Sequence, residues 1–170
     1  GLHDWGIEAP DVAAYAAGGF PYTPPVGLLN GLKVATEMLL AEGLEDVFSR
    51  HHRIAQGIRC AAGAWELELC AVRPELYSDT VSAIRVPDGF DANRLVAHAL
   101  DAYGVSFGTG LGELAGKAFR IGHLGSLTEA MALSGIATAE MVMADLGLPV
   151  RLGSGVAAAQ KYYLRGCSRE

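Results

Sequence analysis

Hydrophobic residues recur along most of the chain at the 3.6-residue period of amphipathic helices. In residues 28–39, for example, six apolar side chains fall on one helical face. A similar pattern continues from Leu44 to Trp65, after Gly43, where a glycine favours a break in the helix. The periodicity predicts helices over residues 11–17, 25–41, 44–65, 91 or 92–103, 127–146 and 154–164.

Four shorter segments have the composition of β-strands. They are rich in apolar and β-branched residues and are bounded by proline or glycine; they are residues 67–72, 80–86, 105–107 and 118–121. Helices alternate with these strands along the chain. This order predicts an α+β fold in which a small, mostly antiparallel sheet is covered by helices.

Composition and charge narrow the class of protein. With 51% hydrophobic and 19% charged residues, the 170-residue chain can form a core and is not disordered throughout. A net charge of −6 with only 13 lysines and arginines argues against nucleic acid or an anionic membrane surface as a partner. Prolines and glycines interrupt the charge-free stretch 12–32, so it cannot be a membrane helix.

Cysteines and histidines suggest no metal centre. Cys60, Cys70 and Cys167 cannot all pair within the chain, and their spacing fits no zinc motif. A reducing compartment is the simplest interpretation, and we predict a cytoplasmic protein. The five histidines form no metal-binding motif, and we expect His51 and His52 to be solvated on a charged helix.

Thr23 stands at the predicted start of a helix, directly before Pro24 and Pro25. In one interpretation it caps the helix, because threonine favours the N-cap and proline the first helical position. In the other it helps to bind an anion, since a helix N-terminus attracts phosphate and a hydroxyl can donate to it. Tyr22 is a candidate second donor, and the residues alone leave both interpretations open.

Arg120 lies between Phe119 and Ile121 in a predicted strand. A guanidinium at such a position needs an anion, because burying an unpaired charge is costly. An internal salt bridge would satisfy it, as would a place at the sheet edge. A substrate carboxylate gripped by two hydrogen bonds would satisfy it equally well.

The glycine-rich connection, residues 108–117, is a poor match to phosphate-binding loops. The Walker pattern fails at Leu111 and Ala118. A G-x-G-x-x-A pattern runs from Gly110 to Ala115, but a dinucleotide site needs a helix after it, and residues 117–121 predict a strand. No serine lies in a G-x-S-x-G motif, so hydrolase chemistry has no support.

Two blocks of the sequence resemble the class V aminotransferases. The first is Phe20-Pro-Tyr-Thr-Pro-Pro25, followed by Leu28-Leu-Asn-Gly-Leu. The second begins at Gly110-Leu-Gly and continues through Gly116-Lys-Ala-Phe-Arg-Ile-Gly-His-Leu-Gly125. The branch most similar to these blocks is that of serine–glyoxylate aminotransferase, with alanine– and aspartate–glyoxylate relatives nearby. The resemblance covers nearly the whole chain.

The resemblance implies a fold-type-I enzyme that depends on pyridoxal 5'-phosphate (PLP) and works as a homodimer. By this resemblance Thr23 reaches the cofactor phosphate of the partner subunit, and Arg120 holds the substrate α-carboxylate. Phe20 stands where the family sometimes has a tyrosine, so that phosphate contact is lost and Tyr22 is a plausible substitute. The implied substrates are serine, alanine or aspartate and glyoxylate or a similar 2-oxo acid.

The resemblance also implies that the catalytic centre lies elsewhere. The Schiff-base lysine of the family is expected upstream of the matched segment, and Lys33, Lys117 and Lys161 lie in no such motif. We therefore expect a C-terminal part of the enzyme. Residues 1–40 would end the large PLP-binding domain and begin the linking helix, and residues 41–170 would form the small domain. We expect no catalytic residue here and no transamination without the complementary N-terminal part.

Two alternatives stay open. A class V relative such as a cysteine desulfurase would need a catalytic cysteine on a mobile loop, whereas Cys60 and Cys70 lie in a predicted helix and strand and Cys167 in the tail. The other alternative is a cofactor-free α+β module for binding or dimerisation. Visible absorbance with added PLP separates it from an enzyme.

Overall fold

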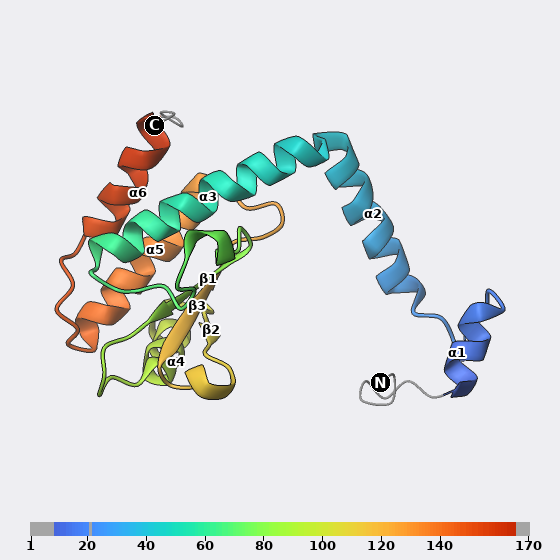
Figure 1. Cartoon of the computed structure of the whole chain (residues 1–170), viewed down its shortest axis with the longest axis horizontal. Coiled ribbons are helices and arrows are strands. Elements are labelled where there is room, and N and C mark those ends of the chain that lie inside the picture. The colour runs from blue at the N-terminus through green and yellow to red at the C-terminus, as the bar shows by residue number, and fades with distance from the viewer. Residues whose placement is uncertain (1–8, 21, 166–170) are drawn as a thin grey trace. The chain divides into compact units, whose positions relative to one another are not determined.

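The structure, a computed structural model, describes residues 9–20 and 22–165. The chain divides into two compact units, Gly1–Leu44 and Glu45–Glu170. The first unit contains helices α1 (Ala9–Ala16) and α2 (Val26–Glu42). The second contains a three-stranded sheet and all but the first residue of helix α3 (Leu44–Ala64), together with the helices that follow it (Figure 1).

Helix α2 confirms the predicted helix after the prolines, but its start differs in detail. The N-cap is Pro25, and no side chain caps the helix. The prediction that Thr23 is the N-cap is therefore wrong. Thr23 lies two residues before the cap, whereas a capping side chain must reach the N–H groups of the first turn from the N-cap itself. Helix α2 ends as predicted at Gly43, which has a φ of 92°.

The larger unit is an α+β fold, as predicted. Its strands β1 (Val81–Arg85), β2 (Gly108–Thr109) and β3 (Ala118–Gly122) form an antiparallel sheet in the order β1-β3-β2. The helices after α3 are α4 (Ala92–Tyr103), α5 (Glu129–Asp145) and α6 (Ser154–Arg165), with short 3₁₀ turns η2 (Pro74–Leu76) and η3 (Gly112–Leu114). Asp91 caps α4, and Thr128 caps α5 through its side chain.

Two strand predictions are wrong. Residues 67–72 make only an isolated bridge from Leu69 to Ile84, because the chain bends away at residue 70 toward the turn that starts at Pro74. Residues 105–107 form no strand, and the pairing with β3 begins instead at Gly108. Hydrogen-bond partners, which composition does not reveal, decide both cases.

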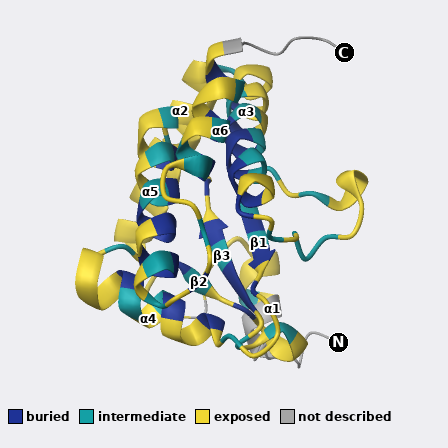
Figure 2. Ribbon diagram, turned by 90° about the vertical axis from the view of Figure 1, so that its left-hand side faces the viewer, coloured by how far each residue is buried: buried dark blue, intermediate teal, exposed yellow. Residues whose placement is uncertain are grey.

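One core joins the sheet to helices α3 to α6, whose inward sides are buried in Figure 2. Residues on one face of the sheet enter this core, notably Ile84 and Phe119, both fully buried. Successive residues of a strand point to opposite faces. Arg120, which follows Phe119, therefore projects from the other face of the sheet.

Glu140 is a buried carboxylate in α5 that ties three elements together. It accepts a hydrogen bond from Trp65 Nε1 at 2.9 Å and two more from the backbone N–H groups of Gly153 and Gly155, at 2.7 and 2.5 Å. The last two donors lie at the N-terminus of α6, where a negative charge is favourable. The charge of Glu140 is thus satisfied by three donors although the residue is only 2% exposed.

Within residues 9–20 and 22–165, no helix is both long and apolar enough to cross a membrane. The same residues contain no cluster of histidine, cysteine, aspartate and glutamate side chains that could hold a metal ion.

Candidate functional site

Arg120 lies on the central strand of the sheet. Its Cα pairs with that of Ala83 in β1 and that of Gly108 in β2. A place at the sheet edge, one of the interpretations left open by the sequence, is therefore wrong. The two cross-strand neighbours are among the smallest residues available, so the arginine side chain has room above the sheet.

The Arg120 guanidinium makes one hydrogen bond, from Nε to the backbone oxygen of Thr109 at 2.8 Å. Within the described residues no carboxylate lies close enough to pair with it. Two other arginines of this unit do have such partners: Arg53 pairs with Glu129, and Arg59 with Asp79. The internal salt bridge that would have explained Arg120 is thus absent from the described part of the chain, and the guanidinium keeps donors for an external anion.

The glycine-rich connection forms a tight loop between β2 and β3. Gly110 donates its N–H to Ala118 O, and a Cβ at Gly110 would lie 2.0 Å from Leu114 O, so only glycine fits there. Gly112 and Gly116 have φ values of 55° and 72°. The loop continues into β3, and no α-helix follows it as a dinucleotide site would require. The glycines serve the turn that leads into the strand of Arg120.

Helix α3 holds the chain that leaves β3. Gly125 donates its N–H to His51 Nε2 at 3.0 Å, and Arg50 donates to Gly125 O at 2.8 Å. His51 Nδ1 lies 2.7 Å from Val47 O. The prediction that His51 is solvated is wrong, because its ring fills the space between α3 and this loop and is only 8% exposed. His52 is exposed as expected.

His123 follows β3 and is fully buried. Its Nε2 hydrogen-bonds with Ser82 Oγ at 2.9 Å, and its Nδ1 with Asp79 O at 3.1 Å. Burial lowers the pKa of His123 below its usual value, and the nearby positive charge of Arg59 adds to this effect. A lowered pKa favours the neutral form of His123, whose ring joins the end of β3 to β1. His123 lies on the core face of the sheet and Arg120 projects from the other face, so the two side chains do not act together.

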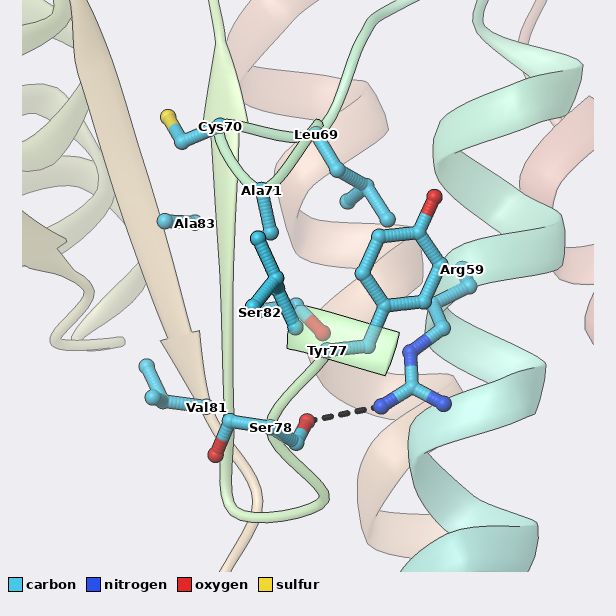
Figure 3. A pocket seen from close by; sticks show the side chains of 10 residues that line it. Arg59, Leu69, Cys70, Ala71, Tyr77, Ser78, Val81, Ser82 and Ala83 are labelled. Atoms are coloured by element: carbon cyan, nitrogen blue, oxygen red, sulfur yellow. Dashed lines mark hydrogen bonds between the residues drawn. The ribbon is translucent and has the colours of Figure 1, made fainter. Parts of the chain in front are cut away.

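A separate cavity of about 290 Å³ lies beside β1, under the segment that contains η2 (Figure 3). Its one charged side chain, Arg59, lies against the ring of Tyr77 and donates to Ser78 O and Asp79 Oδ1. Arg120 does not line this cavity. With its arginine already paired, the cavity offers mainly apolar surface.

Neither of the described cysteines, Cys60 and Cys70, lies where a reactive thiolate is favoured. Burial raises the pKa of the Cys60 thiol and that of Cys70, where Arg85 partly opposes the effect. A raised pKa disfavours the reactive thiolate. Cys60 lies in α3 as predicted, and Cys70 lies in a bend where a strand was expected. Cys167 lies outside the described residues.

Thr23 and Tyr22 belong to the smaller unit and are both exposed. No hydrogen bond joins the Thr23 hydroxyl to another described side chain or backbone group, so it is available to a ligand. The first turn of α2 contains no acidic residue that would repel an anion. A free hydroxyl beside an uncapped helix N-terminus suits a phosphate group. These residues therefore fit the phosphate of PLP.

Sequence reasoning singled out Arg120 but missed the residues that surround it. Gly108 and Thr109 were assigned to a connection, yet they form the strand next to Arg120. A glycine within a strand can mark the close approach of another group, which was the available signal. Nothing in the helical pattern distinguished His51 from His52, because only the fold decides which of two neighbouring histidines faces a loop.

Glyoxylate aminotransferases are among the known proteins to which this chain is similar. The chain is 75% identical over 149 residues to L-aspartate–glyoxylate aminotransferase of Paracoccus denitrificans. The matched residues cover 88% of this chain and 38% of that protein. It is 50% identical over 152 residues to serine–glyoxylate aminotransferase of Hyphomicrobium methylovorum, covering 89% of this chain and 38% of the relative. No protein-family model matches the chain.

Solved structures point the same way. Pyridoxamine–pyruvate aminotransferase from Mesorhizobium loti superposes with a TM-score of 0.80 at 36% identity, over 86% of this chain and 38% of that one. Alanine–glyoxylate aminotransferase from Nostoc superposes with a TM-score of 0.67 at 28% identity, over 73% of this chain and 33% of that one. The chain thus spans little more than a third of the length of the relatives that it matches.

Proposed function

Because this chain is a homologue of the class V glyoxylate aminotransferases, we propose that it supplies the carboxylate-binding part of a PLP-dependent transaminase. The observation that carries the proposal is the Arg120 guanidinium, which has no carboxylate partner among the described residues and is bonded only to Thr109 O. Two relatives are named for glyoxylate and for aspartate or serine. We propose the same class of reaction here, between a small amino acid and glyoxylate or a similar 2-oxo acid.

Each proposed binding residue has a defined task. Arg120 holds the α-carboxylate shared by amino acid and 2-oxo acid, so both substrates bind in one orientation. Thr23 donates its hydroxyl to the cofactor phosphate, with Tyr22 as a second donor. When bound, PLP supplies the electron sink for cleavage of the Cα–H bond. Arg120 would fix the carboxylate end of the substrate, so that its Cα–H bond is held in one orientation.

We further propose that the catalytic lysine is not among Lys33, Lys117 and Lys161, and that activity needs the length that the relatives have beyond this chain. In this proposal residues 1–40 belong to the large domain and residues 41–170 form the small domain. The active form is a cytoplasmic homodimer, in which Thr23 serves the cofactor of the partner subunit.

The test uses a complete protein, in which this chain follows an N-terminal part that corresponds to the rest of its relatives. It is supplied with PLP, glyoxylate and, in turn, serine, alanine or aspartate, and glycine is measured. At least one donor should give glycine, with visible absorbance from the bound cofactor. Absorbance without glycine from any of the three would reject the proposed substrates, and failure to retain PLP would favour the cofactor-free module.

A further inference from the structure

Gly108 leaves a space that the Arg120 side chain occupies. A Cβ placed on Gly108 would lie 3.2 Å from Arg120 Cβ, 3.1 Å from Nε and 3.3 Å from Nη2. All three distances are shorter than ordinary carbon contacts, so the arginine would have to move by a few tenths of an ångström. The arginine side chain therefore lies directly across the bare backbone of Gly108.

The backbone of Gly108 gives no other reason for a glycine. Its φ lies outside the positive range that favours glycine, whereas nine other glycines of the described chain have positive φ values. Glycine weakens a strand compared with residues that carry a side chain. Alanine would thus suit β2 better on local grounds, and the missing side chain serves the arginine rather than the fold.

Thr109 O determines which edge of the guanidinium stays free. A guanidinium can grip a carboxylate through its side edge, with Nε and one Nη, or through its end edge, with both Nη atoms. Arg120 Nε already donates to Thr109 O at 2.8 Å. The end edge is therefore the one left for two parallel hydrogen bonds to a ligand.

We propose that Gly108 and the carbonyl of Thr109 form a cradle that positions Arg120, so that the end edge of its guanidinium receives the substrate carboxylate. The proposal rests on the proposed function of Arg120 and adds to it a positioning residue, Gly108. A side chain at position 108 would tilt the guanidinium away from Thr109 O. One of the two hydrogen bonds to the carboxylate would then be lost, although the charge would remain.

The experiment places Gly108→Ala in the complete enzyme and compares two donors, serine and ethanolamine, which is serine without its carboxylate. We expect kcat/KM for serine to fall about tenfold, mainly through a higher KM, because one hydrogen bond to a charged group is worth about 1.5 kcal/mol. The value of kcat/KM for ethanolamine, which reports only the half-reaction that precedes glyoxylate binding, should not change. The inhibition constant of glycolate, which presents a carboxylate but no amine, should rise by a similar factor.

The matched control is Gly63→Ala in α3, where a new Cβ meets nothing within 4 Å. It should leave both donors and the glycolate inhibition constant unchanged. The melting temperature of Gly108→Ala should stay at or above that of the parent. If ethanolamine reacts too slowly to measure, glycolate inhibition decides alone.

Two results would overturn the cradle. The first is an unchanged reaction with serine together with an unchanged glycolate constant. The second is an equal loss for serine and ethanolamine, which would indicate a general distortion. Arg120→Lys, measured in parallel, separates this failure from that of the proposed function. If Arg120→Lys impairs serine and Gly108→Ala does not, only the cradle fails; if neither does, the carboxylate-binding role of Arg120 fails as well.

Discussion

The indole N–H of Trp65 donates to the carboxylate of Glu140 at 2.9 Å, which joins the end of α3 to the middle of α5. The same carboxylate accepts hydrogen bonds from two backbone N–H groups at the start of α6. A single buried side chain thus holds three helices of the larger unit in place behind the sheet that carries Arg120.

Replacement of Glu140 should destabilise the larger unit. Glu140→Ala removes the acceptor from three donors, two of them buried, and each hydrogen bond to a charged group contributes about 1.5–3 kcal/mol. We expect the free energy of unfolding to fall by about 3 kcal/mol or more, measured by chemical denaturation. Glu113→Ala, at an exposed position in η3, is the control and should change stability little. Equal stabilities for the two variants would show that the three donors find other partners.

Arg120→Lys should separate substrate binding from stability. Lysine keeps the positive charge but cannot form two parallel hydrogen bonds. In the complete enzyme we expect kcat/KM for the amino acid to fall by tens-fold or more, while cofactor absorbance and melting temperature change little. Steady-state kinetics and a thermal melt on one preparation test this. A large drop in melting temperature with nearly normal kinetics would make Arg120 a structural residue.

Thr23→Ala should weaken cofactor retention without destabilising the protein. Because Thr23 does not cap α2, the cost of a lost cap does not apply. A lost charge-assisted hydrogen bond of about 1.5–3 kcal/mol corresponds to a rise of roughly 10- to 100-fold in the dissociation constant of PLP. Thr23→Ser, which keeps the hydroxyl, should retain the affinity. Equilibrium titration of the complete apoenzyme with PLP tests both variants. If the Thr23→Ala and Thr23→Ser variants bind PLP equally well, the phosphate contact of Thr23 is contradicted.

Stability should depend on pH through His123. Its pKa is lowered in the folded protein, chiefly by burial, so the unfolded chain binds the proton more readily. The contribution of neutral His123 is therefore complete above its unfolded pKa of about 6.5 and is lost progressively as the pH falls toward the lower folded value. His123→Gln removes this titration. The stability difference between parent and variant should thus be largest at pH 7–8 and shrink toward pH 5. A difference that does not vary with pH would show that His123 does not titrate in this way.

Residues 1–170 alone should not transaminate. Purified chain mixed with PLP, serine and glyoxylate should give no glycine above background, because none of its lysines lies in the expected Schiff-base motif. The complete enzyme at the same concentration is the positive control. Comparable glycine from both would place the catalytic lysine within this chain.

Much of the architecture follows from local sequence. The apolar period from Leu44 to Trp65 predicts α3, and Asp91 and Gly104 mark both ends of α4, because helices depend on near neighbours and on caps. The strands were less predictable. Residues 67–72 have the composition of a strand but pair with β1 only at residues 68–70. Gly108 and Thr109 have a composition that is unusual for a strand, yet they pair with Arg120 and Phe119.

By itself the sequence determined that Arg120 stands between apolar strand residues and raised the question of which group pairs with it, and the two motif blocks resembled a family in which a substrate carboxylate does so. Only the tertiary structure decided what surrounds Arg120. It placed Arg120 on the central strand without an internal carboxylate among the described residues, and it brought the bare backbone of Gly108 and the carbonyl of Thr109 against the guanidinium. The physical reason is that these contacts cross between strands. Residues 108 and 120 become neighbours only when the sheet forms. The periodicity of the sequence does not reveal which residue of one strand will lie beside a given side chain of another.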